Sequence, residues 1–150
     1  MHLRAAAAHL RRRSNLAFST FGMTTDQYVL LTVLAQEGAA TQQELVRRCY
    51  SDTATIGTML SLLEDKHLVV RTPHPQDGRA RNVKLTPSGN RLAEGMRRAS
   101  FSVRSDLAAL FDKKELATLI RFLERVATAM RPPRRKAVSL RQRLAKRRTI

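Results

Sequence analysis

The sequence lacks three features that would assign it to other classes of protein. It holds a single cysteine, Cys49, so no internal disulfide can form and we expect a cytoplasmic location. It has no run of about 18 apolar residues, the length that a membrane-spanning helix needs, and its first residues lack the apolar core of a signal peptide. Only six of the 150 residues are glycine, which favours a compact and mainly helical domain.

Acidic residues are also scarce. The chain has 28 lysines and arginines against 12 aspartates and glutamates, a formal net charge of +16. Residues 131–150 hold nine of the basic residues and no acid, so residues 1–130 hold 19 against 12, a net charge of +7. Because the body of the chain is basic even without this tail, we expect a polyanionic partner, either nucleic acid or an anionic membrane surface.

The motifs of catalytic and metal sites are missing as well. The sequence has no glycine-rich phosphate loop, no helical histidine pair of the zinc-protease type and no evident pair of catalytic carboxylates. Its four histidines are scattered and lack the spacing of metal ligands. We therefore expect a protein that is not an enzyme and that carries no metal or other cofactor.

Apolar residues recur at helical spacing through most of the chain. The spacing predicts helices over residues 2–20, 87–110 and 113–130, and three more that begin after Thr24, Thr41 and Asp52. Thr24 with Gln27, Thr41 with Glu44, and Asp112 with Glu115 form capping-box patterns, and Thr86 followed by Pro87 is a further helix start.

The periodicity changes after His67. The segments "LVVRT" and "NVKL" have the composition or alternation of strands, and "QDG" between them is a turn signal. Helix, tight turn at Tyr50 and Ser51, helix and then two strands is the order of a winged helix-turn-helix. We therefore expect a mainly α fold with a small β-wing and about six helices.

The second helix of this pair is expected to enter the major groove of DNA. Its first turns carry small or hydroxylic side chains, which can approach base edges or thymine methyls: Thr53, Ala54, Thr55, Gly57 and Thr58. The alternative is that a threonine-rich helix start is only a solvated surface.

The loop between the two strands is basic. Arg79 and Arg81 would lie beside the second helix, where they can meet phosphates or enter a narrow minor groove. Asp77 and Gly78 tighten the turn, and an ion pair from Asp77 can hold Arg79 in place.

The stretch "DGRARNVKLTPSG" resembles the wing of MarR-type (multiple antibiotic resistance regulator) transcription factors, and the resemblance extends over about residues 3–130. Its most specific parts are the Asp77–Arg79 pair and the Leu85-Thr86-x-x-Gly89 run. Two positions depart from the family pattern. His67 stands where the family usually has glycine, and the second helix of the pair lacks an arginine in its first two turns, with Thr53 and Thr58 where such residues often fall.

The resemblance implies a homodimer joined through the N- and C-terminal helices. It divides the chain into an N-terminal dimerisation helix (1–22), a winged helix-turn-helix lobe (23–86), C-terminal dimerisation helices (87–130) and a basic tail (131–150). The apolar stripes of the last two helices support this, because they exceed what one small lobe can cover.

The resemblance also implies a ligand-responsive repressor that binds double-stranded DNA at a pseudo-palindromic operator. The residues expected at the DNA are Thr41, Gln42, Gln43, Asp52, Thr53, Ala54, Thr55, Thr58, Asp77, Arg79 and Arg81. In the family, effectors, often aromatic acids, lie between the dimer helices and the DNA lobes. The residues expected around a small aromatic or anionic effector are Arg12, Arg13, Phe18, Phe21, Tyr28 and Phe101, and several of these aromatics are alternatively core residues.

Two other functions are open at this stage. One is an architectural or weakly specific DNA-binding protein, which a footprint on the DNA upstream of its own gene would separate from a specific regulator. The other is a winged-helix interaction module whose basic tail anchors it to a membrane surface, which liposome binding by residues 131–150 would test. Cys49 lies on the apolar side of its helix, so we expect a core cysteine rather than an oxidant sensor.

Overall fold

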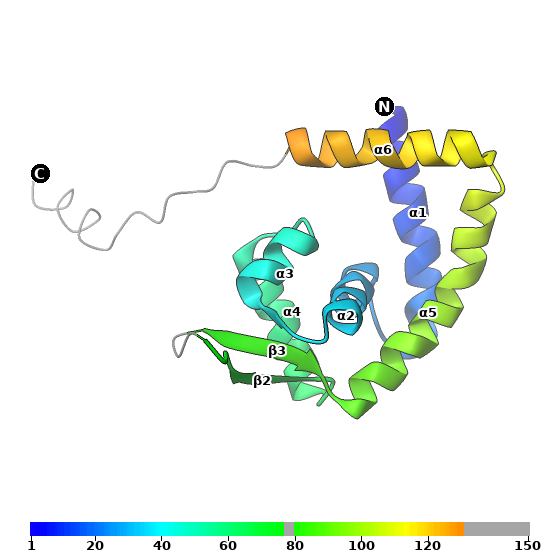
Figure 1. Cartoon of the computed structure of the whole chain (residues 1–150). Helices are drawn as coiled ribbons and strands as arrows, with labels where there is room; N and C mark the ends of the chain where they lie inside the picture. Colours follow the sequence, from blue (N-terminus) through cyan, green and yellow to red (C-terminus); the bar gives the residue numbers. More distant parts are fainter. Residues whose placement is uncertain (77–79, 131–150) are drawn as a thin grey trace, which may run out of the picture.

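The structure, a computed structural model, describes residues 1–76 and 80–130 and is built mainly from helices (Figure 1). In chain order its elements are α1 (His2–Phe18), the 3-10 turn η1 (Ser19–Phe21), α2 (Thr25–Glu37), β1 (Ala40–Thr41), α3 (Gln42–Arg48), α4 (Thr53–Asp65), β2 (Val69–Pro73), β3 (Arg81–Leu85), α5 (Pro87–Ala108) and α6 (Lys113–Ala129). The expected mainly helical fold with a winged helix-turn-helix is confirmed.

Helix starts lie where the capping patterns predicted them. The side chains of Thr24, Thr41 and Asp112 each accept a hydrogen bond from the backbone of the third helical residue, whose own side chain bonds back to the cap. The side chain of Thr86 also accepts a hydrogen bond from the N–H of Gly89 at the start of α5, with Pro87 in the first turn. Each of these caps satisfies backbone groups that the helix leaves open, so local sequence determines where the helices begin.

The first helix is shorter than predicted. Periodicity favoured a helix over residues 2–20, but α1 ends at Phe18 and the chain tightens into η1 before Gly22, whose φ is +61°. The side chain of Phe18 is buried and stacks on Tyr28 of α2, with ring centroids 4.6 Å apart. Packing of this ring against α2 thus accompanies the change from α-helical to 3-10 geometry.

The sheet has one strand more than the sequence predicted. Its order is β1-β3-β2 and both pairs are antiparallel. The residues of β2 and β3 pair from Val69 with Leu85 to Pro73 with Arg81, which forms the expected wing. The missed strand β1 has only two residues, Ala40 and Thr41, which is too short for an alternating pattern.

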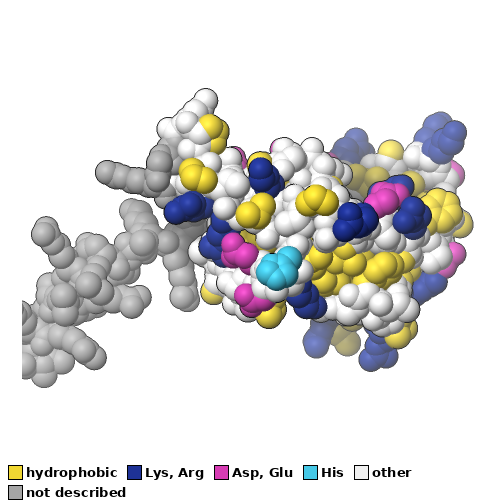
Figure 2. All heavy atoms as spheres, turned by 90° about the horizontal axis from the view of Figure 1, so that it is seen from below, with side chains coloured by type: hydrophobic (Ala, Val, Ile, Leu, Met, Phe, Trp, Pro, Cys, Tyr) yellow, Lys and Arg dark blue, Asp and Glu magenta, His cyan; other side chains and the backbone are white. Residues whose placement is uncertain are grey.

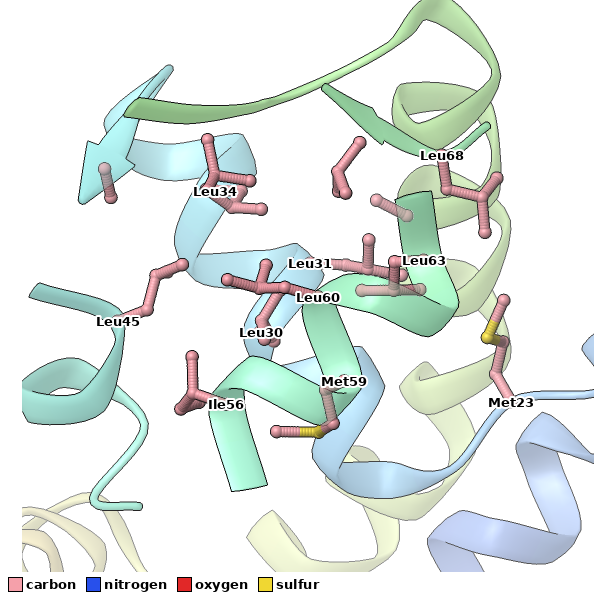
Figure 3. Close-up of a cluster of buried hydrophobic side chains, with 14 of the residues drawn as sticks. Met23, Leu30, Leu31, Leu34, Leu45, Ile56, Met59, Leu60, Leu63 and Leu68 are labelled. Carbon is pink, nitrogen blue, oxygen red and sulfur yellow. The ribbon is translucent and has the colours of Figure 1, made fainter. Parts of the chain in front are cut away.

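The core lies between α2, α4 and the sheet (Figure 3). Leu30 and Leu31 of α2 point toward Leu60 and Leu63 of α4, and Leu45 joins them from α3. Burial of such a side chain stabilises the fold by about 1.5–3 kcal/mol. The leucines of α2 are therefore buried, whereas Val29 of the same helix stays 38% exposed.

α1 and α5 pack against each other and against α2, whereas α6 turns back at the end of α5 and runs across the top of the molecule (Figure 1). Ion pairs join α1 to the other two helices, Arg11 to Asp26 of α2 and Arg13 to Asp106 of α5. No residue of α6 is buried. The apolar stripe of this helix therefore has no cover within residues 1–76 and 80–130.

His67 occupies the turn between α4 and β2 in a left-handed conformation, with φ +55°. Its N–H donates to the carbonyl oxygen of Glu64 at 2.8 Å, and its own carbonyl oxygen accepts a hydrogen bond from the Thr86 hydroxyl at 2.8 Å. Left-handed backbone is strained for a residue with a Cβ and is not for glycine.

We expect His67→Gly to raise the free energy of unfolding by about 0.5–1 kcal/mol, because it removes this strain. Urea denaturation measures the change. His74→Gly is the matched control, since His74 does not have positive φ. An equal effect of both substitutions would show that the backbone conformation at residue 67 is not the cause.

Candidate nucleic-acid interface and cavity

The helix-turn-helix is formed by α3, the turn at Tyr50 and Ser51, and α4. Tyr50 has φ +50°, so the tight turn depends on a left-handed residue, as the turn before β2 does. At the start of α3 a carboxylate oxygen of Glu44 accepts hydrogen bonds from the N–H and the hydroxyl of Thr41, both at 2.8 Å. Both bonds lower the pKa of Glu44, and the bond from the backbone N–H has the larger effect. The Glu44 carboxylate is therefore ionised at neutral pH.

α4 has one buried and one exposed face. Ile56, Met59, Leu60 and Leu63 are buried and hold the helix to the domain (Figure 3). The residues that the sequence assigned to DNA lie on the other side and are exposed: Thr53, Ala54, Thr55 and Thr58. The structure therefore brings these four together on one surface at the N-terminal half of the helix.

Asp52 caps α4 and remains exposed at its tip. One carboxylate oxygen accepts from the Thr55 N–H at 2.9 Å and the other from the Thr55 hydroxyl at 2.7 Å. The backbone bond is the larger cause of the lowered pKa of Asp52. Because the Thr55 hydroxyl donates to Asp52, it reaches a base edge only as an acceptor or by giving up this bond.

α3 contributes the remaining predicted residues of the helix-turn-helix. Thr41 caps this helix and Gln42 and Gln43 are its first two residues. The side-chain nitrogen Nε2 of Gln42 donates to the carbonyl oxygen of Thr53 at 3.1 Å, which joins the N-terminal ends of α3 and α4. Sequence reasoning missed this contact, because no local pattern indicates how the two helices cross.

The wing stands beside α4. Arg81, the first residue of β3, is exposed and pairs with Pro73 of β2. The guanidinium of Arg71 in β2 contacts the Glu64 carboxylate of α4 at 3.0 Å. Asp77 and Arg79, the other two residues predicted in the wing, lie outside the described residues. The Arg71–Glu64 ion pair fixes the base of the wing to the C-terminal part of α4.

Lysine and arginine side chains are spread over the underside of the molecule, and part of the exposed apolar surface lies between them (Figure 2). This distribution matches the net charge of +7 that residues 1–130 carry without the tail. A surface of this sign attracts the phosphates of a nucleic acid.

A cavity of about 480 Å³ lies between α1, α2 and α5. Two of the six residues predicted around an effector, Phe18 and Tyr28, line it. Its other walls include Val29, Ser100, Val103 and Leu107. The charged residues in the lining are Arg104 and the ion pair of Arg11 with Asp26. The lining is therefore apolar and aromatic, with a small number of polar groups.

A hydrogen bond joins α2 to α5 in this lining. The hydroxyl oxygens of Tyr28 and Ser100 lie 3.1 Å apart, and the Ser100 hydroxyl also donates to the Arg97 carbonyl oxygen at 2.8 Å. Because Ser100 has one hydroxyl proton, Tyr28 is the donor to it. The bond links α2 to the long helix α5.

The other four residues predicted around an effector do not line the cavity. Arg12 is exposed, and Arg13 forms the ion pair with Asp106. Phe21 packs against the core, close to Gly95 of α5, and Phe101 is 69% exposed. The structure instead places Arg11 and Arg104 there, which sequence periodicity on α1 and α5 could not distinguish from their neighbouring arginines.

Cys49 lies at the end of α3 and is half-buried. Burial, with a smaller effect of the Asp26 charge, raises the pKa of its thiol to about 11. A reactive sensor cysteine needs the opposite, a lowered pKa and free access. The environment of Cys49 is therefore that of a packed cysteine.

We expect iodoacetamide to alkylate native Cys49 far more slowly at pH 7 than a free cysteine, because about one thiol in ten thousand is ionised at that pH when the pKa is about 11. The rate should still be rising above pH 9. Mass spectrometry at a series of pH values measures it, with the urea-unfolded chain as control. Rapid modification of the folded chain at pH 7 would contradict the raised pKa.

In residues 1–76 and 80–130 no helix is long and apolar enough to cross a membrane, and no three side chains of His, Cys, Asp or Glu are placed to hold a metal ion.

The model of the MarR family matches residues 23–80, the segment from the start of α2 into the wing. A putative transcriptional regulatory protein for the hcr operon of Thauera aromatica is 30% identical over 126 residues, which cover 79% of this chain and 76% of that protein. The HTH-type transcriptional regulator MgrA of Staphylococcus aureus is 28% identical over 119 residues, with coverage of 79% and 80%.

Solved structures show the same fold. A mutant MarR from E. coli, crystallised in a complex with operator DNA, superimposes with a TM-score of 0.75 at 26% identity, over 83% of this chain and 89% of that one. The similarity extends beyond the segment that the family model matches.

Proposed function

The chain belongs to the MarR family, and we propose that it is a homodimeric repressor that binds a pseudo-palindromic operator and leaves it when a small aromatic acid binds. DNA binding in the regulation of transcription follows from the family and the named relatives. Such a protein acts in the cytoplasm as a regulator and not as an enzyme.

The observation that carries this proposal is the exposed face of α4 beside a wing that is fixed to the same helix. Small side chains at its N-terminal half let the helix approach base edges in the major groove. Arg81, with Arg79 predicted at the wing, supplies charge for phosphates or the minor groove. Shape readout by the wing is important here, because the first turns of α4 hold no arginine.

Dimerisation follows from the apolar surface that the lobe leaves uncovered. On α6 the exposed large apolar side chains are Ile120, Phe122, Leu123 and Val126, and on α1 they are Leu3, Leu10 and Leu16. Exposed stripes of this kind usually mark association. We assign residues 1–22 and 87–130 to the dimer and 23–86 to DNA, so each dimer presents two copies of α4.

The test is DNA binding by the full chain to duplexes selected from a random pool, followed by a footprint. We expect enriched sequences with two inverted half-sites whose centres are roughly 10 base pairs apart, one helical turn. Affinity should fall steeply with salt, as phosphate contacts require. Equal affinity for every duplex would instead favour the architectural alternative, and a stable monomer that binds a single half-site would contradict the dimer.

The cavity between α1, α2 and α5 is the proposed effector site, because it lies where the DNA lobe meets the dimer helices. Its aromatic wall suits a ring, and Arg104 suits a carboxylate, whereas Arg11 is already paired with Asp26 in the same lining. A ligand releases DNA only if it binds the dimer more tightly when the two DNA lobes have a spacing that does not fit the operator. Binding of the ligand must then lower the affinity for the operator, and binding of the operator must lower the affinity for the ligand by the same factor.

We expect benzoate, as a minimal aromatic carboxylate, to release the operator complex, and Tyr28→Ala and Arg104→Ala to blunt this release more than they weaken DNA binding. Fluorescence anisotropy of a labelled operator at fixed salt measures both quantities. Arg12→Ala is the control, since it removes the same charge from an exposed position outside the cavity. If a broad set of aromatic acids leaves operator affinity unchanged, the ligand switch fails and DNA binding stands.

A further inference from the structure

The side chain of Gln42 lies across the N-terminal ends of both helices of the helix-turn-helix. Gln42 is the first residue of α3 and is half-buried, and its Nε2 donates to the carbonyl oxygen of Thr53, the first residue of α4, at 3.1 Å. A carbonyl oxygen only accepts hydrogen bonds, so the amide nitrogen must be the atom that faces it. This contact fixes the orientation of the amide.

Gly57 makes room for that amide on the exposed face of α4. It lies one turn beyond Thr53, and a Cβ built at residue 57 would be 3.2 Å from Nε2 of Gln42, closer than ordinary van der Waals contact. Glycine is a poor helix former and is unfavourable in the interior of a helix. Its presence in the second turn of α4 is explained by the space that Gln42 occupies.

We infer that Gln42 is a specificity-determining residue that reads an adenine in each half-site, an inference that rests on the proposed DNA-binding function. A primary amide has two N–H groups and one carbonyl oxygen, and Thr53 uses one N–H. The other N–H and Oε1 remain, one donor and one acceptor on the same plane. This is the pair that matches N7 and the N6 amino group of adenine in the major groove.

The composition of α4 leaves this role to α3. Gly57 has no side chain, Ala54 has only a methyl group, and the Thr55 hydroxyl donates to Asp52. Thr53 and Thr58 each offer a single hydroxyl, which lacks the separate donor and acceptor atoms of an amide. Gln42, by contrast, carries a donor and an acceptor and is held against α4 before DNA arrives. Such preorganisation lowers the entropy lost when the amide binds a base.

The experiment compares the full chain with Gln42→Ala on duplexes enriched from a random pool by the wild-type protein. Each base pair of one half-site is substituted in turn and the dissociation constants are measured. We expect one A·T pair at which the wild type discriminates roughly 5- to 150-fold and Gln42→Ala hardly discriminates, with the other positions unchanged. Gln43→Ala, which truncates the adjacent exposed amide of α3, should keep discrimination at that pair.

Gly57→Ala is a second variant that leaves Gln42 in place. Its Cβ displaces the amide, so discrimination at the same A·T pair should fall while the melting temperature does not, because alanine favours the helix. An unchanged base profile for Gln42→Ala on enriched duplexes would overturn this inference alone. If the wild type enriches no sequence, the proposed function fails and the role of Gln42 fails with it.

Discussion

Replacement of Gly89 by alanine is expected to lower the free energy of unfolding by about 3 kcal/mol or more, the largest stability effect that we predict for a single methyl group in this chain. A Cβ at residue 89 would lie 2.0 Å from the carbonyl oxygen and 3.0 Å from the carbonyl carbon of Leu68. These are backbone atoms at the base of the wing, so no side-chain rotation relieves the overlap.

The surrounding hydrogen bonds prevent the two segments from moving apart. The Thr86 N–H donates to the Leu68 carbonyl oxygen at 3.0 Å, the Thr86 hydroxyl donates to the His67 carbonyl oxygen, and the Gly89 N–H donates to that hydroxyl at 3.0 Å. The first turn of α5 is thereby tied to the turn between α4 and β2. A methyl group at residue 89 would break these hydrogen bonds and displace the start of α5 from the wing.

Urea denaturation followed by circular dichroism measures the effect. Gly95→Ala is the matched control on the same helix, because its Cβ would meet only the ring of Phe21 at 3.0 Å, and a side chain can adjust where a backbone cannot. We expect its effect to be small, since the better helix propensity of alanine offsets part of the crowding. Equal stability of Gly89→Ala and the wild type would mean that the close approach of α5 to Leu68 is not maintained in solution.

Leu123→Glu should abolish the dimer and weaken operator binding by at least about 100-fold, because two linked lobes bind with avidity and one lobe alone does not. Leu123 lies on the apolar stripe of α6 and is 45% exposed within a single chain. A carboxylate there stays in water in the monomer but would be buried without a partner in the proposed interface. The lobe itself should remain folded, since no residue of α6 is buried in it.

Analytical ultracentrifugation measures the association and anisotropy with the selected duplex measures the binding. Lys114→Gln changes the charge of α6 by the same one unit at an exposed position on the side opposite to Leu123, and should leave both association and binding nearly unchanged. A Leu123→Glu chain that still sediments as a dimer would place the interface elsewhere and remove α6 from the assigned dimerisation helices.

Much of the fold could be predicted because local groups decide it. Thr24, Thr41 and Asp112 cap helices where their spacing to the third helical residue indicated, since a capping box needs only four consecutive residues. The order of the helices and of the two wing strands and the exposed set on α4 follow from periodicity, because period 3.6 and period 2 each place apolar residues on one face. The basic charge that attracts DNA is likewise a property of composition.

Only the tertiary structure decided the features that join segments distant in sequence. β1 exists because β3 pairs with it, and its two residues have no strand pattern of their own. Arg11 and Arg104, rather than Arg12 and Arg13, line the cavity, because the rotation of α1 against α5 is determined by packing between the helices and not by either helix alone. The contact of the Gln42 side chain with Thr53 and the need for glycine at residue 89 arise in the same way, since each depends on how closely two segments approach after the core has formed.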